Sequence, residues 1–170
     1  MREEKVSTNA TLCFLIKENK VLLAMKADKI GKDCWNGYGG GIENGESPNQ
    51  SAIRELEEEA GVVTFAEVME KVAIVDFHNT KSDGKQFVCR VYVYLVRRWS
   101  GEPQETEEML TPTWFEIDNL PFSQMMPADR IWLPYVLSGK KIMAEAHLGP
   151  FQKTLIKDVV VDQVTELPNE

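Results

Sequence analysis

Apolar residues along the chain occur in short runs separated by polar turns, a pattern typical of β-strands. Many of these residues are β-branched or aromatic, which favours extended backbone. We expect strands at residues 11–16, 21–25, 71–78, 86–99 and 111–117. Only four polar residues separate the first two segments, which predicts a β-hairpin. The segment 151–164 alternates enough to hold one or two further strands.

One helix is predicted with clear ends. Ser47 can cap its start, Pro48 fits the first helical position, and Gln50 can complete a capping box. Gly61 is suited to end it, because glycine adopts the left-handed conformation that follows many helices.

This helix should pack on the sheet through one apolar stripe, formed by Ile53, Leu56 and Ala60. A second helix is expected over residues 127–138, with Pro134 shortening or kinking it. Strands combined with two helices predict an α/β fold, in which a mixed sheet carries a helix on each face.

The length of 170 residues suits a single domain over residues 1–170. A net charge of −8 without a basic run argues against duplex nucleic acid as a partner, but not against a single nucleotide. No apolar stretch reaches the roughly 20 residues that cross a membrane, and the first ten residues are too charged for a signal peptide. Cys13, Cys34 and Cys89 have the spacing of reduced thiols. We therefore expect a cytoplasmic protein, and a monomer.

The acidic half of the first predicted helix points to chemistry. Glu55, Glu58 and Glu59 are spaced i, i+3, i+4 and share a face near the carboxyl end, where the helix dipole disfavours negative charge. Three carboxylates in one turn offer the all-oxygen site that Mg²⁺ or Mn²⁺ prefers. The alternative is an acidic face that only contacts solvent.

The spacing around these glutamates is specific. The residues in fixed positions are Gly40, Glu46, Arg54, Glu55, Leu56, Glu58, Glu59, Gly61 and Val62. This pattern resembles the signature of the Nudix hydrolases without a departure at any of these positions. The resemblance implies an α/β/α sandwich with the Nudix loop and helix on one face of the sheet. It also implies metal-dependent hydrolysis of a diphosphate that is linked to another group.

Roles follow from the resemblance. Glu55, Glu58 and Glu59 would ligate metal, and backbone carbonyls of Gly39 and Gly40 could add ligands. Glycines there let the backbone approach metal and phosphate closely. Arg54 would hold a signature carboxylate in place, although an ordinary i,i+4 pair with Glu58 is the alternative. Glu46 would tie the loop to the helix start.

The similarity extends to the MutT homologues that hydrolyse oxidised purine nucleoside triphosphates such as 8-oxo-dGTP. It covers residues 11–46, 107–122, 125–134 and the tail after Lys140. By this resemblance Asn36 would bond the purine base and Asp129 would read its Watson–Crick edge. Thr11 and Lys26 would lie beside base, sugar and phosphates. The remaining implied residues are Gly40, Val75, Phe87 and Met126 for the substrate and Glu108 as a further metal-binding or water-activating carboxylate.

The chain departs from this branch in the base pocket. Met126 replaces a stacking Trp, Ala128 replaces the first of two adjacent aspartates, and Val75 and Ile30 each replace a Phe. Lost stacking weakens the grip on a base. Dihydroneopterin triphosphate, O6-alkylated or ordinary dNTPs and other nucleoside diphosphate derivatives therefore stay open as substrates. A nucleotide-binding module without catalysis is a separate alternative, although every metal-binding glutamate is present.

Several other residues are expected to have structural roles only. His78 and His147 lack ligand spacing in the sequence, and we expect no catalytic role for them. The acids of residues 102–108, other than Glu108, are expected in a solvated loop. Packing in the core is predicted for Trp114, Phe115, Trp132 and Tyr135.

Overall fold

A computed structural model describes residues 6–168. Part of the N-terminal segment that we expected not to be a signal peptide therefore lies outside the described residues. The described chain forms an eight-stranded sheet in the order β3-β2-β1-β5-β4-β7-β8, with β6 paired to β2. The strands are β1 (Val6–Lys17), β2 (Lys20–Lys26), β3 (Trp35–Asn36), β4 (Met69–Thr80), β5 (Gln86–Val96), β6 (Met109–Glu116), β7 (Lys141–Pro150) and β8 (Val160–Val164).

The sheet is mixed. β1 runs parallel to β5, and β4 runs parallel to β7, whereas the other neighbours are antiparallel. The predicted hairpin is confirmed, because Ile16 pairs with Val21 and Lys17 with Lys20 across the β1–β2 turn. The polar segment after β4 likewise forms the turn into β5.

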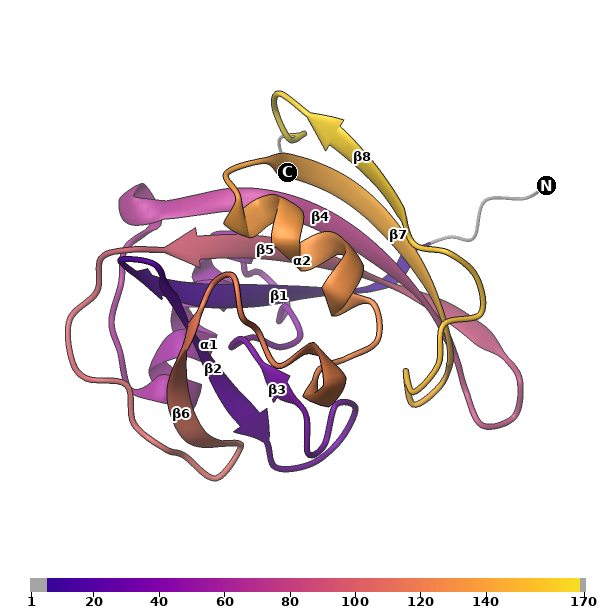
Figure 1. Cartoon of the computed structure of the whole chain (residues 1–170), viewed down its shortest axis with the longest axis horizontal. Helices are drawn as coiled ribbons and strands as arrows, with labels where there is room; N and C mark the ends of the chain where they lie inside the picture. Colours follow the sequence, from indigo (N-terminus) through magenta and orange to yellow (C-terminus); the bar gives the residue numbers. More distant parts are fainter. Residues whose placement is uncertain (1–5, 169–170) are drawn as a thin grey trace.

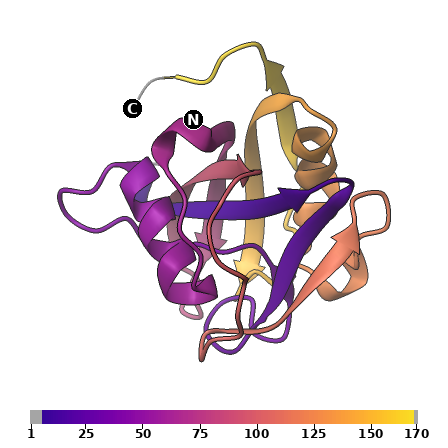
Figure 2. The same ribbon diagram turned by 90° about the vertical axis from the view of Figure 1, so that its left-hand side faces the viewer.

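Two α-helices cover the sheet, α1 (Pro48–Ala60) and α2 (Asp129–Leu137), with short 3₁₀ turns at Ala66–Val68 and Phe122–Gln124. Figure 1 shows α2 in front of the strands, and Figure 2 shows α1 and α2 on opposite sides of them. The predicted α/β/α sandwich is thus confirmed. Among residues 6–168 no helix has the length and apolar character needed to cross a membrane.

Alternation along the strands divides the core into two layers. On β1, Phe14 and Ile16 belong to the layer beneath α2, whereas Cys13 and Leu15 belong to the layer beneath α1. Successive strand residues point to opposite faces, so β1 serves both layers. Both helices are therefore held by burial of apolar side chains on a shared sheet.

The predicted ends of α1 are confirmed. Oγ of Ser47 accepts the Gln50 N–H at 3.2 Å, and the Gln50 side chain accepts the Ser47 N–H at 2.9 Å, forming the capping box. Gly61 has φ 71° and ends the helix. The predicted packing stripe is wrong at one position: Ala52 is fully buried with Leu56 and Ala60, whereas Ile53 is half-buried. Residues 52, 56 and 60 are spaced by four and follow the sheet more closely.

The second helix is shorter than predicted. Pro127 and Ala128 form a turn, and the helix begins at Asp129 and ends at Leu137. Pro134 lies inside it, so one backbone hydrogen bond is missing. Burial of Trp132, Leu133 and Val136 against the sheet holds this short helix in place. All four aromatics predicted to pack do so: Phe115, Trp132 and Tyr135 in this layer, and Trp114 in the layer beneath α1.

The C-terminal region contains a long strand that the sequence pattern did not predict. β7 begins at Lys141, ahead of the segment where strands were expected, whereas β8 lies within that segment. The core-facing side of β7 includes Ala144 and Ala146. Alanine has a low strand preference, which explains why the pattern was weak here.

Candidate active site

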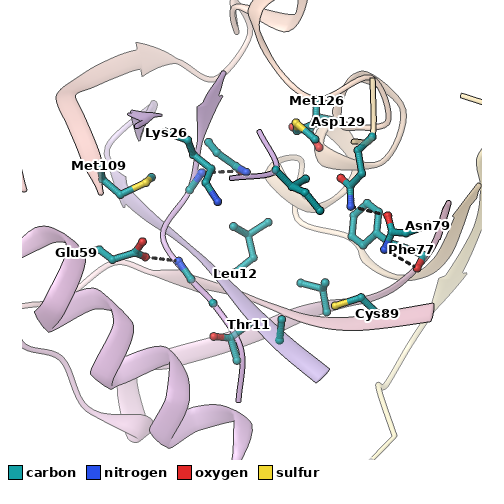
Figure 3. Close-up of a pocket in the computed structure, with 18 of the residues that line it drawn as sticks. Thr11, Leu12, Lys26, Glu59, Phe77, Asn79, Cys89, Met109, Met126 and Asp129 are labelled. Carbon is teal, nitrogen blue, oxygen red and sulfur yellow. Dashed lines mark hydrogen bonds between the residues drawn. The ribbon is translucent and has the colours of Figure 1, made fainter. Parts of the chain in front are cut away.

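A cavity of about 270 Å³ opens on the α2 side of the sheet. Its floor continues the face of the core layer beneath α2, at the point where that helix no longer covers the strands. Leu12, Val91 and Phe77 come from three neighbouring strands and share this face. Figure 3 shows Glu59 and Met109 at one end of the cavity and Phe77 and Asn79 at the other. A cavity between a helix end and an acidic helix can hold an elongated, partly charged ligand.

Most of the residues predicted to bind substrate lie on this cavity. They are Thr11, Lys26, Asn36, Gly40, Phe87, Met126 and Asp129. Val75 does not line it, and the prediction for this residue is wrong. Val75 is fully buried in the layer with Trp132, so α2 covers it. The wall of the cavity begins two residues later on the same face of β4, at Phe77.

The sequence reading missed the polar residues at the far end of the cavity. Nδ2 of Asn79 donates to the carbonyl of Phe77 at 3.2 Å, and Nε2 of Gln152 donates to Oδ1 of Asn79 at 2.7 Å. Strand alternation could have indicated Asn79, because it lies two residues after Phe77 and therefore on the same face of β4. Gln152 is 73 residues away in sequence, and nothing local indicates that its loop folds over β4.

Asp129 stands at the first turn of α2 with its carboxyl group almost fully buried. Nε1 of Trp132 donates to Oδ1 at 3.2 Å, whereas Oδ2 has no hydrogen-bond partner among the described residues. Burial raises the pKa of this carboxyl to about 7. A buried acceptor or donor without a partner is costly, which suits a group that pairs with a ligand.

Residues 39–41 form a glycine loop that contacts both β1 and α1. The Thr11 N–H donates to the Gly40 carbonyl at 2.9 Å, and the Gly39 N–H donates to Oε1 of Glu59 at 2.8 Å. A Cβ at Gly39 would collide with the Thr11 carbonyl. Glycine is therefore required for the loop to reach β1 and the helix at the same time.

Arg54 organises the acidic residues around this loop. Its Nε and Nη2 donate to both carboxylate oxygens of Glu46 at 2.7 and 3.0 Å. Its Nη1 donates to Glu55 at 3.1 Å and to Glu58 at 3.2 Å, and Nη2 also donates to the Gly41 carbonyl at 3.2 Å. Arg54 thus makes both contacts that were considered for it. It holds carboxylates of the signature in place, and it also forms the i,i+4 pair with Glu58. The bidentate pair with Glu46 lowers the pKa of that carboxyl.

Two carboxylates of the signature are buried side by side. Burial raises the pKa of Glu59 to about 8, and the charges of Glu55 and Glu108 add to the effect. The pKa of Glu55 is also raised, mainly by burial, although Arg54 opposes this. Buried like charges require a cation or a proton. The all-oxygen donor set therefore fits a hard divalent ion.

Glu58 and Glu108 lie at the solvent side of this group. Glu58 is exposed and contacts Arg54. Glu108 is exposed too, in the segment that precedes β6. That segment is tied to the end of α1, because Oγ1 of Thr106 donates to the Glu59 carbonyl at 2.9 Å. Tertiary contact therefore brings Glu108 near Glu55 and Glu59, and no local pattern shows it.

Comparisons with known proteins show which family the chain is similar to. The NUDIX domain model matches residues 6–136. The oxidized purine nucleoside triphosphate hydrolase of Danio rerio is 36% identical over 133 residues, which is 78% of this chain and 81% of that protein. The mouse protein of the same name is 35% identical over 131 residues, 77% of this chain and 80% of that protein.

A solved structure shows the same fold. The mutator MutT protein of Bacillus halodurans superposes with a TM-score of 0.76 at 22% identity, covering 92% of this chain and 98% of that one. The chain belongs to the Nudix family, and it is a Nudix hydrolase. Hydrolases of this family generally use divalent metals.

Proposed function

We propose that this enzyme hydrolyses oxidised purine nucleoside triphosphates, such as 8-oxo-dGTP, to the monophosphate and pyrophosphate, with Mg²⁺ or Mn²⁺. One observation carries the proposal: a single cavity joins Asn36 and Asp129, which can bond a base, to Glu59 of the acidic helix. The names of the relatives from Danio rerio and mouse support the same substrate class. Removal of oxidised nucleotides from the precursor pool is the corresponding role.

At the acidic end, the residues that would hold metal are Glu55, Glu58, Glu59 and Glu108, with the carbonyls of Gly39 and Gly40. A bound divalent ion neutralises phosphate charge and lowers the pKa of a water molecule. The Gly39 N–H engages Oε1 of Glu59, which leaves Oε2 of Glu59 for a ligand. Arg54 fixes the orientation of Glu55 through Nη1. Lys26 lines the same cavity and offers a positive charge to a phosphate.

At the base end, two side chains can read hydrogen-bonding groups. Oδ1 of Asn36 accepts the Gly37 N–H at 2.8 Å, so the amide NH₂ of Asn36 remains as a donor. Asp129 adds a carboxyl that donates when protonated and accepts when ionised. A second carboxyl is missing, because alanine stands at position 128 where the related branch has an aspartate. Met126 supplies a flexible apolar wall in place of an aromatic ring. The pocket therefore supports purine binding with fewer polar contacts than two aspartates would provide.

A hydrolysis panel tests the proposal. The substrates are 8-oxo-dGTP, dGTP, 2-hydroxy-dATP, dihydroneopterin triphosphate, ADP-ribose and a dinucleoside polyphosphate. The expected result is metal-dependent release of pyrophosphate, with the highest kcat/KM for an oxidised purine. Preference for dihydroneopterin triphosphate or ADP-ribose would reassign the substrate, and absence of turnover on every compound would favour a binding module.

Glu58→Gln tests the metal site separately from the base. We expect kcat to fall by at least about 10³, the scale of a lost electrostatic catalyst. Near wild-type turnover in Glu58→Gln would contradict the assignment of this carboxylate, whichever base is preferred.

We also propose that the enzyme acts as a monomer in the cytoplasm. The three cysteines are free thiols, two of them half-buried and one fully buried, as expected in a reducing compartment. Size-exclusion chromatography with light scattering and imaging of the tagged protein would check the two statements.

A further inference from the structure

The sheet brings the two histidines of the chain together. His78 on β4 and His147 on β7 face each other in the parallel pairing of these strands. Their rings stack, with centroids 4.1 Å apart and an interplanar angle of 17°. The sequence contains two histidines in total. Both imidazoles of the protein therefore meet at one point, although they are 69 residues apart by their numbers (147 − 78).

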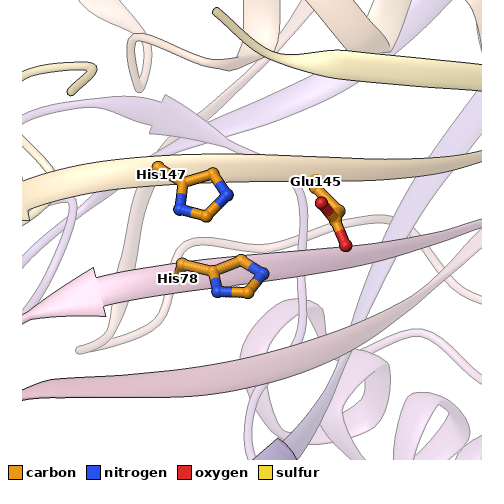
Figure 4. A group of neighbouring side chains, drawn as sticks. All are labelled: His78, Glu145 and His147. Carbon is orange, nitrogen blue, oxygen red and sulfur yellow. The ribbon is translucent and has the colours of Figure 1, made fainter. Parts of the chain in front are cut away.

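Glu145 adds a carboxylate to this pair. It precedes His147 by two residues, and alternate residues of a strand share a face. Figure 4 shows the Glu145 carboxylate beside the two rings. One ligand atom from each residue can be chosen so that all three lie within 4.8 Å of one another. Ligands of a tetrahedral zinc site are about 3.4 Å apart, given bonds of about 2.0–2.1 Å. Side-chain rotation can close the remaining gap, because Glu145 is exposed and the histidines are half-buried.

The group lies on the opposite face of the sheet from the cavity. His78 sits between Phe77 and Asn79, which both line the cavity from the other face of β4. Asp76, which shares the histidine face, is already paired with Arg90 at 2.8 and 3.0 Å. Glu145 is therefore the carboxylate that is placed to join the histidines.

We propose that His78, Glu145 and His147 bind a divalent transition-metal ion of the Zn²⁺ class, at a site separate from the carboxylates of α1. Imidazole nitrogens suit Zn²⁺, Ni²⁺ and Cu²⁺, whereas Mg²⁺ takes oxygen ligands. Three protein ligands leave one position for water. An ion held by β4 and β7 crosslinks two strands of the core sheet and stabilises the fold, because it binds the folded chain and not the unfolded one. It also fixes the strand that carries Phe77 and Asn79.

Zinc titration in excess Mg²⁺ tests the histidine site, because the Mg²⁺ occupies the carboxylates of α1 and competes with zinc there. We expect calorimetry to show one equivalent of bound Zn²⁺. The ring signals of both histidines should shift together in NMR spectra, and no other histidine exists to confuse them. At free Zn²⁺ about 100 times Kd, Tm should rise by about 5 °C or more. Absence of zinc binding in excess Mg²⁺, or a shift of one histidine alone, would overturn the proposal.

Variants assign the ligands. His78→Gln and His147→Gln should each lower zinc affinity by at least about 100-fold, since loss of an outer-shell partner alone costs about 10–100-fold. Glu145→Gln should weaken zinc binding and keep Mg²⁺-dependent hydrolysis. Because Glu145 is exposed, this variant should fold, and it tests the site even if the histidine variants do not fold. Cys34→Ser, which removes a half-buried thiol, should bind zinc as wild type does.

A Glu55→Gln/Glu59→Gln variant separates the two sites. It should keep the zinc affinity of the histidine group whatever happens to nucleotide hydrolysis. Zinc binding that is lost in this variant or in Cys34→Ser, or that survives both histidine changes, would contradict the assignment.

Discussion

Gly40 and Glu55 are packed so closely that no side chain fits between them. A Cβ built on Gly40 would lie 2.5 Å from Oε1 of Glu55. Arg54 holds that same oxygen through a hydrogen bond of 3.1 Å, so Glu55 is not free to move aside. The Glu55 carboxylate can therefore keep this position only because residue 40 is a glycine and carries no side chain.

Gly40→Ala should therefore lower kcat/KM and Mg²⁺ affinity. Displacement of a catalytic group by about 1 Å can cost about 10²-fold, and we expect a loss of that order. Gly41→Ala is the matched control, because a Cβ there meets no atom within 4 Å. Steady-state kinetics at several Mg²⁺ concentrations would measure both. Equal effects of the two changes would show that the contact with Glu55 is unimportant.

Arg54→Lys should damage the site although the charge is retained. Lysine cannot reproduce the bidentate pair with Glu46 while also reaching Glu55 and the Gly41 carbonyl. We expect a loss of about 10–100-fold in metal affinity or activity, as for partners that orient metal ligands. Metal titration followed by activity at saturating metal would separate the two effects.

Arg97→Lys is the control for that change. Arg97 makes a hydrogen bond of 3.0 Å to Glu70, and both side chains are about half exposed. Such surface pairs contribute about 0–1 kcal/mol, so stability and kcat should stay near wild type. If Arg54→Lys is as mild as Arg97→Lys, Arg54 acts only as a surface charge.

Glu59 should make the metal-free protein less stable as the pH rises. Its pKa is raised from 4.5 to about 8, mainly by burial. The folded state therefore binds this proton more tightly than the unfolded state does. The contribution of the group is complete below about pH 4.5 and is lost as the pH rises to about 8. In the presence of a chelator, Glu59→Gln should remove part of this loss, so its Tm should exceed that of wild type at pH 8.

Mg²⁺ should reverse the same effect, since it binds the ionised carboxylates. The Tm increase caused by Mg²⁺ should grow between pH 5 and pH 8 in wild type, the window set by the Glu59 pKa, and much less in Glu59→Gln. Glu57→Gln removes an equal charge from an exposed position on the same helix and should behave as wild type. A Glu57 variant that matches Glu59→Gln would mean that only the net charge of α1 matters.

Asp129→Ala should weaken recognition of the base and spare the acidic site. The change leaves a base edge without a partner in the cavity, which costs about 1–3 kcal/mol for a buried unsatisfied group. The loss should appear in kcat/KM for 8-oxo-dGTP and dGTP but not for a pyrimidine triphosphate, and the metal dependence should not change. Equal losses on all three substrates, or none, would show that Asp129 does not read the base.

The pKa of Asp129 also predicts a pH dependence. The carboxyl is protonated below about pH 7 and can then donate from Oδ2 to the base. The ratio of kcat/KM for 8-oxo-dGTP to that for a pyrimidine triphosphate should therefore fall as the pH rises through about 7. Asp129→Asn keeps a donor at every pH, so its ratio should stay flat. A ratio independent of pH in wild type would exclude donation by this group.

Local features of the sequence were sufficient for α1. Its caps, the short β1–β2 turn and the i, i+3, i+4 carboxylates depend on residues within a few positions of one another. The signature spacing also predicted the family, which the comparisons confirm. The fold class followed from strand-length runs and two helices. Weaker local patterns predicted the other elements less accurately: α2 starts two residues later than predicted, and β7 was not predicted.

The cavity was decided by the tertiary structure. Alternation shows that Val75, Phe77 and Asn79 share a face of β4, but only the tertiary structure determines that Val75 packs in the core and that the other two line the cavity. Gln152 and Glu108 reach the site through loops that cross large sequence distances. Sequence patterns report such contacts only weakly, because no neighbouring residue depends on them.

The sequence by itself determined the acidic helix and the chemistry expected of its carboxylates, because helix geometry places residues three and four apart on one face. The tertiary structure alone decided how strongly those carboxylates are perturbed, since burial of Glu59 raises its pKa to about 8. It also decided that His78 and His147 stack, because the β4–β7 pairing joins strands whose residues have no local relationship. Desolvation and strand pairing are properties of the packed chain, and spacing along the sequence does not contain them.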